Sequence, residues 1–322
     1  MMKRDLFICY TPLQVLIAKA IIQSGACGKE KPDFYLFALS ESDRYKHYYD
    51  DMKSLCNYSE LVTSLPRFPF YLRWLGARFK SKVYNQIFFA SIDSVHIQYI
   101  LSMISFESVA TFDDGTANIM SGSKYYKPAS NFSTRIKLFL RWCFGNRYTS
   151  HSMVAASTKH YTLYKDMSNI ITNTVPLDMF MPSEDSADNE RDGELVVILG
   201  TVLKDVLENE EAKPESVRRI SKFLNELPHG DKVYLPHPRD ETDYFLDIPR
   251  CDSPLIAEEV IINYAKSYKK ITLIGFGSST QFNLMGQGFI HNTVITSSLF
   301  KDVFGSLAEM LCDTGADAIS ID

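Results

Sequence analysis

The sequence lacks the features of several common classes of protein. Its six cysteines, scattered over 322 residues, form no C-x-x-C pair, which argues against a zinc cluster or a disulfide framework and favours reduced thiols. No stretch approaches the roughly 20 apolar residues of a membrane span, and the first residues lack the apolar core and cleavage site of a signal peptide. We therefore expect a cytoplasmic chain without a metal site.

Other signatures of ligand chemistry are missing as well. No G-x-G-x-x-G motif lies near the amino terminus, which disfavours an NAD-dependent oxidoreductase. No acidic pair with metal-binding spacing stands beside a nucleotide-type strand. Nucleic acid is disfavoured as a partner, because no recognition motif accompanies the basic residues.

What the chain does contain is typical of a packed globular protein, with 45% hydrophobic and 23% charged residues. Its length favours two domains, because single cores stop growing at about 250–300 residues. The polar stretch at residues 181–194 shows no apolar periodicity. We therefore place the domain boundary there and expect domains at residues 1–185 and 186–322.

The net charge of −5 hides an asymmetry between the two halves. Residues 1–180 carry 21 Lys and Arg against 14 Asp and Glu, a balance of +7, which leaves 13 against 25, or −12, for the rest. Much of the positive excess lies in two aromatic-rich stretches, residues 67–82 and 135–147. Such a composition suits either an anionic membrane surface or a solvated helix face over an aromatic core, and the sequence leaves both readings open.

Apolar runs alternate with helical patterns along both halves. Residues 5–10 and 33–39 read as strands on either side of a helix with Thr11 as N-cap and Pro12 at its first position, and residues 107–112 read as a further strand. After the boundary we expect four strands separated by helical segments, at residues 194–200, 232–236, 269–276 and 289–297. Strands joined through helices form parallel sheets with right-handed crossovers. The predicted fold class is therefore α/β, with two Rossmann-like lobes that face each other across a cleft.

Ligands of such sheets bind beyond the carboxyl ends of the strands, so the residues that follow each strand are the candidates for a site. In the first half these are Asp113, Asp114 and Gly115. In the second half three loops qualify, with Gly200, Thr201, Asp205 and Glu208 in the first, His237, Pro238 and Arg239 in the second, and Gly277, Ser278, Ser279 and Thr280 in the third.

Each candidate has a chemical and a structural interpretation. Ser278 is expected at a helix start, where hydroxyl groups and unpaired backbone N–H groups can bind a phosphate or simply cap the helix. His237 could protonate or hydrogen-bond a departing phosphate oxygen, although an isolated histidine more often has a structural role. Glu258, near the start of a helix, could reach ribose hydroxyls or could only favour the helix dipole. Of Asp113 and Asp114, adjacent in an extended segment, one should face inward and the other outward, unless they form only a turn.

Seven short motifs occur in an order and spacing that cover nearly the whole chain. They are CYTPLQ at 9–14, TFDDGTANI at 111–119, KHYTLYKDMSNI at 159–170, ILGT at 198–201, PHPR at 236–239, SPLIAEE at 253–259 and the serines at 278–279. Together they resemble the bacterial sialyltransferases of glycosyltransferase family 52, the lipooligosaccharide sialyltransferase type. The resemblance implies a GT-B fold, CMP-sialic acid as the donor substrate, no metal or other cofactor, inversion at the anomeric carbon and a homodimer.

The same resemblance assigns roles to single residues. It makes His237 the general acid or the stabiliser of the leaving phosphate, Glu258 the ribose-binding carboxylate and Ser278 the phosphate ligand. The general base is Asp205, in the loop after ILGT, or Asp114 of the DDG motif, which serves in related sialyltransferase families; Glu208 is a weaker candidate. The remaining motif positions are expected to contact substrates, namely Thr11, Gln14, Asp113, Gly200, Thr201, Pro238, Arg239, Gly277 and Ser279.

The implied function is the transfer of sialic acid to a galactose-type hydroxyl of a bacterial surface glycan, such as an O-antigen, a capsule or a lipooligosaccharide, and hence a role in lipopolysaccharide biosynthesis. The expected location is the cytoplasm, with peripheral contact at the inner face of the inner membrane if the basic stretches bind anionic lipid. Two alternative functions stay open, because each would use the same residues to bind a CMP-sugar donor. They are another CMP-sugar transferase, such as a polysialyltransferase or a Kdo transferase, and a non-catalytic sugar-nucleotide binding module.

Overall fold

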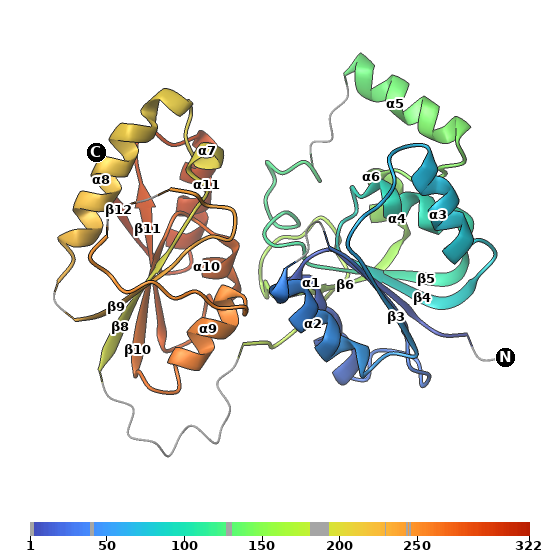
Figure 1. Cartoon of the computed structure of the whole chain (residues 1–322), viewed down its shortest axis with the longest axis horizontal. Coiled ribbons are helices and arrows are strands. Elements are labelled where there is room, and N and C mark those ends of the chain that lie inside the picture. Colours follow the sequence, from blue (N-terminus) through green and yellow to red (C-terminus); the bar gives the residue numbers. More distant parts are fainter. Residues whose placement is uncertain are drawn as a thin grey trace. The chain divides into compact units, whose positions relative to one another are not determined.

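The chain folds into two compact units, Met1–Met179 and Phe180–Asp322. The computed structural model describes residues 3–38, 42–126, 131–180, 193–228, 230–242, 244 and 246–322 (Figure 1). The boundary that we expected, between residues 185 and 186, lies outside the described residues. Each unit contains one parallel sheet, so the prediction of two α/β domains of GT-B type is confirmed, whereas the cleft stays a prediction.

Unit 1 is built on a seven-stranded sheet in the order β3-β2-β1-β4-β5-β6-β7, in which every pairing is parallel. The strands are β1 (Leu6–Cys9), β2 (Asp33–Phe37), β3 (Tyr58–Val62), β4 (Val83–Phe89), β5 (Ser105–Phe112), β6 (Ser157–Thr162) and β7 (Thr174–Pro176). The helices are α1 (Pro12–Gln23), α2 (Asp43–Lys53), α3 (Phe70–Phe79), α4 (Val95–Met103), α5 (Phe132–Cys143) and α6 (Ser150–Ala156). Helices α1 and α2 pack together on one face of the sheet, and α3 and α4 on the other (Figure 1).

Burial at the centre of this sheet accounts for the apolar sequences of its strands. Strands β1 and β2 bury every residue, as expected for strands covered on both faces, and their near-continuous apolar runs made them readable. Helix α1 begins as predicted, because the Thr11 side chain accepts a hydrogen bond from the Gln14 N–H and Pro12 occupies the first turn. The start of α1 therefore fixes where Gln14 lies relative to the carboxyl end of β1.

Unit 2 contains a five-stranded parallel sheet in the order β12-β11-β10-β8-β9. Its elements are β8 (Glu194–Leu199), α7 (Leu203–Val206), the 3₁₀ turn η2 (Glu210–Ala212), α8 (Lys213–Asn225), β9 (Asp231–Leu235), α9 (Ala257–Tyr264), β10 (Lys270–Gly275), α10 (Ser279–Asn283), β11 (Ile290–Thr296), α11 (Asp302–Cys312) and β12 (Asp317–Ser320). The four predicted strands are confirmed. Our expectation that the strand ending near residue 297 is the last one was wrong: β12 is a fifth strand, exposed and without an apolar run, so it carried no strand signal.

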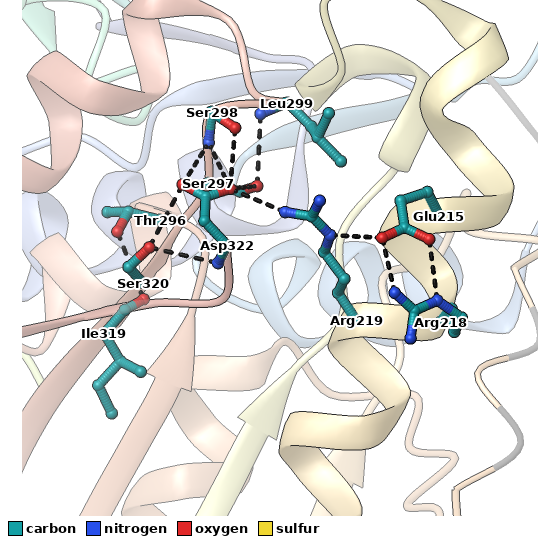
Figure 2. A network of polar contacts seen from close by, with 10 residues as sticks. All are labelled: Glu215, Arg218, Arg219, Thr296, Ser297, Ser298, Leu299, Ile319, Ser320 and Asp322. Atoms are coloured by element: carbon teal, nitrogen blue, oxygen red, sulfur yellow. Dashed lines mark hydrogen bonds and ion pairs between the residues drawn. The ribbon is translucent and has the colours of Figure 1, made fainter.

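The end of the chain is tied to unit 2 by polar contacts (Figure 2). The Asp322 side chain accepts hydrogen bonds from the Ser297 hydroxyl at 2.8 Å and from the N–H and hydroxyl of Ser298, and it pairs with the Arg219 guanidinium at 2.9 Å. Arg219 also pairs with Glu215, one turn earlier on α8. This network holds the β11–β12 edge of the sheet to α8.

The two aromatic and basic stretches of unit 1 differ in burial. In α3 the side chains of Tyr71, Leu75 and Phe79 are buried in the core, and the Arg78 guanidinium stacks over the Trp74 ring at 3.7 Å. Helix α5, by contrast, has no buried residue. Within the residues that the structure describes, no helix is long and apolar enough to cross a bilayer.

Candidate active site

In unit 2 three loops follow adjacent strands at one edge of the sheet. Strand β8 lies between β9 and β10, so the loops that begin at Gly200, Pro236 and Phe276 are neighbours. With strand spacings of about 4.8 Å, the outer two loops start roughly 10 Å apart. This edge therefore gathers His237, Gly200 and Ser278 as the sequence predicted.

Gly200 lies so close to the His237 loop that no side chain fits. A Cβ atom on Gly200 would approach the Tyr234 hydroxyl to 2.6 Å, the backbone nitrogen of His237 to 2.7 Å and the Pro236 Cα to 3.0 Å. The Gly200 N–H donates to the Leu235 carbonyl at 2.7 Å. The absence of a side chain on Gly200 lets the two loops pack against each other and so sets the position of His237, whereas the expected substrate contact stays a prediction.

The His237 ring is half-buried and held in one orientation. Its Nδ1 atom accepts a hydrogen bond from the Arg239 N–H at 3.1 Å, and its carbonyl accepts from the Asp240 N–H at 2.9 Å. An Nδ1 atom that accepts a hydrogen bond carries no proton, so the neutral ring has its proton on Nε2. We assign this tautomer from the hydrogen-bond geometry. It makes Nε2–H the group that can donate to a ligand.

Asp205 lies on the short helix α7, where its side chain is about half exposed. Its carboxylate faces the Arg239 guanidinium, with the nearest N–O distance 3.5 Å and 71% of the Arg239 side chain exposed. The structure thus brings Asp205 next to the His237 loop, but it holds this carboxylate loosely. In the same loop Pro238 is exposed, and Thr201 is half-buried where β8 leads into α7.

Ser278 caps α10, which has five residues. Its hydroxyl accepts from the Gln281 N–H, while the Gln281 Oε1 atom accepts from the N–H groups of Ser278 and Gly277 at 3.2 and 3.0 Å. We had expected unpaired N–H groups here, and this was wrong for those two, because the Gln281 side chain folds back on them. Gly277 has a positive φ of 77°, which favours glycine, and Ser279 is the first helical residue.

Glu258 lies in the first turn of α9 and is 4% exposed. Its Oε1 atom accepts a hydrogen bond from the Asn283 amide at 2.7 Å, which ties α9 to α10. Burial raises the pKa of the Glu258 carboxyl above its usual range, while hydrogen bonds from its own backbone, from Asn283 and from Thr280 oppose this shift. A buried acid beside the Ser278 helix is a costly arrangement, so it is a good candidate for a binding role.

In unit 1 three side chains from separate segments meet around Asp114. Its Oδ1 atom accepts from the Gln14 amide at 2.7 Å, and its Oδ2 atom accepts from the Tyr125 hydroxyl at 2.9 Å and from the Ser91 hydroxyl at 3.1 Å. Burial and the nearby Asp114 carboxylate raise the pKa of Tyr125, which stays a donor. Asp114 is a half-buried residue, unlike the fully buried Asp113, and three donors orient its carboxylate.

Asp113 is used differently from its neighbour. It is fully buried, with one oxygen 2.9 Å from the His160 Nε2 atom and the other accepting from the Leu163 N–H at 2.6 Å. The expected division into an inward and an outward carboxylate is thus what the structure shows. A substrate contact by Asp113 is not supported, because both of its oxygens bind β6 and the loop after it.

Thr11 and Gln14, which we expected to touch substrates, form hydrogen bonds to other residues of unit 1. Thr11 caps α1, and Gln14 is 1% exposed with its amide on Asp114 and Ser91. The supporting residues Ser91 and Tyr125 escaped sequence analysis. Ser91 follows β4 closely and would have been a candidate had that strand been recognised, whereas nothing in the sequence around Tyr125 pointed to this contact.

In the described parts of both units, no group of three or more His, Cys, Asp and Glu side chains is placed to hold a metal ion. The two sheet edges offer instead an oriented carboxylate in unit 1 and, in unit 2, an Nε2–H donor, an arginine and a buried acid. A carboxylate can accept a proton from a hydroxyl, and N–H donors and an arginine can stabilise negative charge on a phosphate.

Comparison with known proteins agrees with these observations. The model of glycosyltransferase family 52 matches residues 29–299. An N-acetyllactosaminide alpha-2,3-sialyltransferase of Haemophilus influenzae is 29% identical over 92% of this chain and 93% of its own. A CMP-N-acetylneuraminate:beta-galactoside alpha-2,3-sialyltransferase of Pasteurella multocida is 32% identical over 88% of each chain.

Among solved structures, the glycotransferase of kitacinnamycin has a TM-score of 0.52 at 9% identity, and the match covers all of this chain and 87% of that one. This likeness shows the two-unit α/β fold and nothing about the substrate. The assignment rests on the family match and on the sialyltransferase relatives, which align with about nine tenths of this chain. The chain belongs to glycosyltransferase family 52.

Proposed function

We propose that this glycosyltransferase is an inverting, metal-independent sialyltransferase that moves sialic acid from CMP-sialic acid to a galactose-type hydroxyl of a bacterial surface glycan. Membership of family 52 carries the proposal, and both relatives described above are named as alpha-2,3-sialyltransferases. The site chemistry supports it, because unit 2 offers groups that can bind a phosphate and a ribose, and unit 1 offers an oriented carboxylate that can accept a proton.

On the donor side, His237 donates the Nε2 hydrogen to the phosphate oxygen that leaves with CMP. A histidine that transfers a proton to the phosphate starts with both ring nitrogens protonated, and a protonated Nδ1 could no longer accept the hydrogen bond from the Arg239 N–H. This bond therefore favours a neutral ring that donates a hydrogen bond to the phosphate and keeps its proton. Arg239 adds positive charge beside the phosphate, and Ser278 is the expected phosphate ligand. Glu258, a buried carboxylate in the first turn of α9, is the expected partner of the ribose hydroxyls.

On the acceptor side, Asp114 takes the proton from the attacking hydroxyl. Three donors fix its carboxylate, so little reorganisation is needed when it becomes protonated. Asp205 remains the rival, since it lies next to the His237 loop, but the Arg239 contact at 3.5 Å orients its carboxylate only weakly. Inversion follows if the hydroxyl attacks from the face opposite the departing phosphate.

CMP carries one phosphate, so less negative charge develops on departure than with a nucleoside diphosphate. Hydrogen-bond donors of the kind found here typically supply about 3 kcal/mol each when they are well placed. The proposal therefore needs no metal. A homodimer, a cytoplasmic location and a role in lipopolysaccharide biosynthesis stay predictions of the sequence.

The deciding experiment compares donors. The purified chain is incubated with CMP-sialic acid or CMP-Kdo, with EDTA present, and with or without lactose. We expect CMP release from CMP-sialic acid, a sialylated lactose product, and no loss of rate with EDTA. Preference for CMP-Kdo would replace the proposal by the rival transferase, and CMP binding without any turnover would leave a binding module.

A further inference from the structure

The motif at residues 159–170 has no part in the function proposed so far, although it lies directly beside the DDG motif. Its first four residues belong to β6, which pairs with β5, the strand that leads into Asp113 and Asp114. In the register of the sheet, Thr111 of β5 is the partner of His160 of β6. The motif is therefore the sheet neighbour of the segment that carries the proposed base.

Three buried polar side chains form a chain of hydrogen bonds between these two strands. The Thr111 hydroxyl lies 2.9 Å from the His160 Nδ1 atom. The His160 Nε2 atom lies 2.9 Å from the Asp113 Oδ1 atom. All three residues have an exposed fraction of 0%. Polar groups are costly to bury unless each of them is paired, so the loss of one partner should disturb the others.

The direction of these hydrogen bonds follows from what each atom can do. An ionised carboxylate only accepts, so the His160 Nε2 atom carries a proton and donates to Asp113. The Nδ1 atom of the neutral ring then accepts from the Thr111 hydroxyl. We assign this tautomer from the hydrogen-bond geometry. The Asp113 Oδ2 atom accepts from the Leu163 N–H at 2.6 Å, so groups of β6 and of the loop after it hold both carboxylate oxygens.

The backbone of the DDG motif is held by the same neighbour. The Asp113 N–H donates to the Tyr161 carbonyl at 3.2 Å. The Asp114 N–H donates to the Asn118 Oδ1 atom at 3.4 Å. The Asn118 carbonyl in turn accepts from the Ile170 N–H at 3.0 Å. Residues at the beginning and at the end of the 159–170 motif therefore hold the segment that contains Asp114.

The position of this segment decides whether the Asp114 carboxylate is oriented. Its three donors, Gln14, Ser91 and Tyr125, come from other segments and bind it at 2.7, 3.1 and 2.9 Å. A displacement of Asp114 by about 0.5 Å would already stretch such bonds beyond their usual range. The three donors can therefore act together only while the backbone on either side of Asp114 stays in place.

We propose that His160 is a positioning residue for Asp114 and that it acts through Asp113. The His160 ring is fully buried, so it does not reach the substrates. It fixes the Asp113 side chain, and the position of Asp113 sets that of the next residue in the chain. This role rests on the proposed function in taking Asp114 as the general base, whereas the anchoring of Asp114 is a structural property that can be tested without activity.

Two amide side chains separate the roles of the two ring nitrogens. In His160→Gln the amide can donate near the position of Nε2 and keep the bond to Asp113. The shorter amide of His160→Asn lies near the position of Nδ1 and leaves Asp113 without this donor. With CMP-sialic acid and lactose as substrates, we expect His160→Asn to lower kcat about 10²-fold, because a small misplacement of a reacting group costs this much. His160→Gln should stay within about 5-fold of wild type.

The KM for CMP-sialic acid should change little in either variant, because the donor-side residues belong to unit 2. A double variant shows whether the loss of rate passes through Asp114. Residues that act as one unit have effects that do not multiply. His160→Asn/Asp114→Ala should therefore be about as fast as Asp114→Ala alone. Losses that multiply in the double variant would contradict the role proposed for His160.

Tyr84→Phe is the matched control for stability. The Tyr84 hydroxyl donates to the Asp33 carboxylate at 3.2 Å, near the amino ends of β4 and β2 in the same sheet, and both residues are buried. Like His160→Asn, this variant removes a hydrogen bond from a buried carboxylate, so its Tm should fall. Its kcat should stay within about 2-fold of wild type, because Asp114 keeps its supports.

Asp113→Asn replaces His160→Asn if that variant does not fold. It keeps the size of the side chain but turns one acceptor into a donor, which then faces either the His160 Nε2–H group or the Leu163 N–H. We expect the same loss of kcat, about 10²-fold, and the same result when it is combined with Asp114→Ala.

Crystal structures of the two His160 variants test the anchoring without activity. In His160→Asn the Asp114 carboxylate should leave the Gln14 amide, which binds it at 2.7 Å, and in His160→Gln this contact should persist. If wild type released no CMP from CMP-sialic acid, the proposed function would fail while this structural result would still stand or fall by itself. An Asp114 that keeps all three donors in His160→Asn, or a His160→Asn variant that turns over like wild type, would overturn the proposal.

Discussion

The carboxyl edges of the two sheets organise their polar groups in different ways. In unit 1, side chains from α1, from the loop after β4 and from the segment before α5 converge on the carboxylate of one half-buried residue, Asp114. In unit 2 the backbone does most of the positioning. Gly200 packs directly on the His237 loop, and the Arg239 N–H sets the ring tautomer.

This difference fits the chemistry that we propose for each edge. A base must be held in one orientation while its protonation changes, and side-chain donors can do this. A leaving phosphate needs donors that are already fixed before the reaction, and a rigid loop supplies them. The comparison therefore predicts that side-chain changes matter most in unit 1, and that backbone changes are as harmful as side-chain changes in unit 2.

The largest effect is expected at Asp114. Asp114→Ala and Asp114→Asn should each lower kcat about 10³-fold, and the remaining rate should lose the acidic limb of its pH profile, because the group that must be ionised is gone. Asp205→Ala, measured beside them, should lower kcat less and keep that limb. The reverse ranking would assign the base to unit 2 and remove the contrast between the edges.

His237 comes next. His237→Ala should lower kcat about 10²-fold with CMP affinity largely kept, as read from calorimetric titration with CMP. His237→Gln separates hydrogen bonding from proton transfer, because its amide can donate near the position of Nε2 but cannot supply a proton. We expect the Gln variant to recover about 10-fold over Ala. Equal rates for the two variants would favour a general acid.

Gly200→Ala tests whether the backbone positions His237. The added methyl group meets the His237 nitrogen at 2.7 Å, so the loop must move, and we expect kcat to fall about 10-fold with a lower Tm. Gly288→Ala is the matched control in the same unit, where a Cβ atom meets nothing within 4 Å. Should Gly200→Ala turn over like the control, the close packing of the two loops would have no catalytic consequence.

The smallest effect concerns Glu258 and stability. Burial raises the pKa of this carboxyl, so the folded unit binds its proton more tightly than the unfolded chain does. The free energy of unfolding therefore falls as the pH rises from the unfolded pKa of Glu258, ~4.3, through its folded pKa. Glu258→Gln cannot titrate. We expect its Tm to exceed that of wild type by about 2 °C at pH 7 and the gain to shrink below pH 4.

The same variant should weaken CMP binding about 10-fold if Glu258 accepts hydrogen bonds from the ribose. Glu309→Gln, at an exposed residue of α11 in the same unit, is the control and should change neither quantity. A Tm gain without loss of CMP affinity would leave Glu258 as a structural acid.

Much of this protein could be predicted from residue patterns. The apolar runs of β1, β8 and β10 and the Thr11 cap of α1 are local signals, and each element formed where its sequence indicated. Position at a strand end was enough to select His237 and Asp114, because parallel strands deliver their loops to one edge. β12 was missed because an exposed edge strand needs no apolar run.

Other features depended on contacts between distant parts of the chain. Gln14 and Asp114 are 100 residues apart in sequence, so no local pattern could show that the amide serves the carboxylate. The burial of Asp113 depends in the same way on His160. In α5 the 3.6-residue period of apolar residues defines an apolar side, but it does not show whether that side faces the core or solvent. Only packing, with Tyr99 on the polar side of the helix, decided that the apolar side faces outward.

The sequence by itself determined the strands with strong apolar runs, the start of α1 and the candidate residues at the strand ends, because these follow from local propensity and hydrophobic period. The tertiary structure decided which of two adjacent aspartates is fully buried, which histidine nitrogen carries the proton and which face of α5 meets solvent. These depend on hydrogen bonds and burial between segments that only the folded chain brings together.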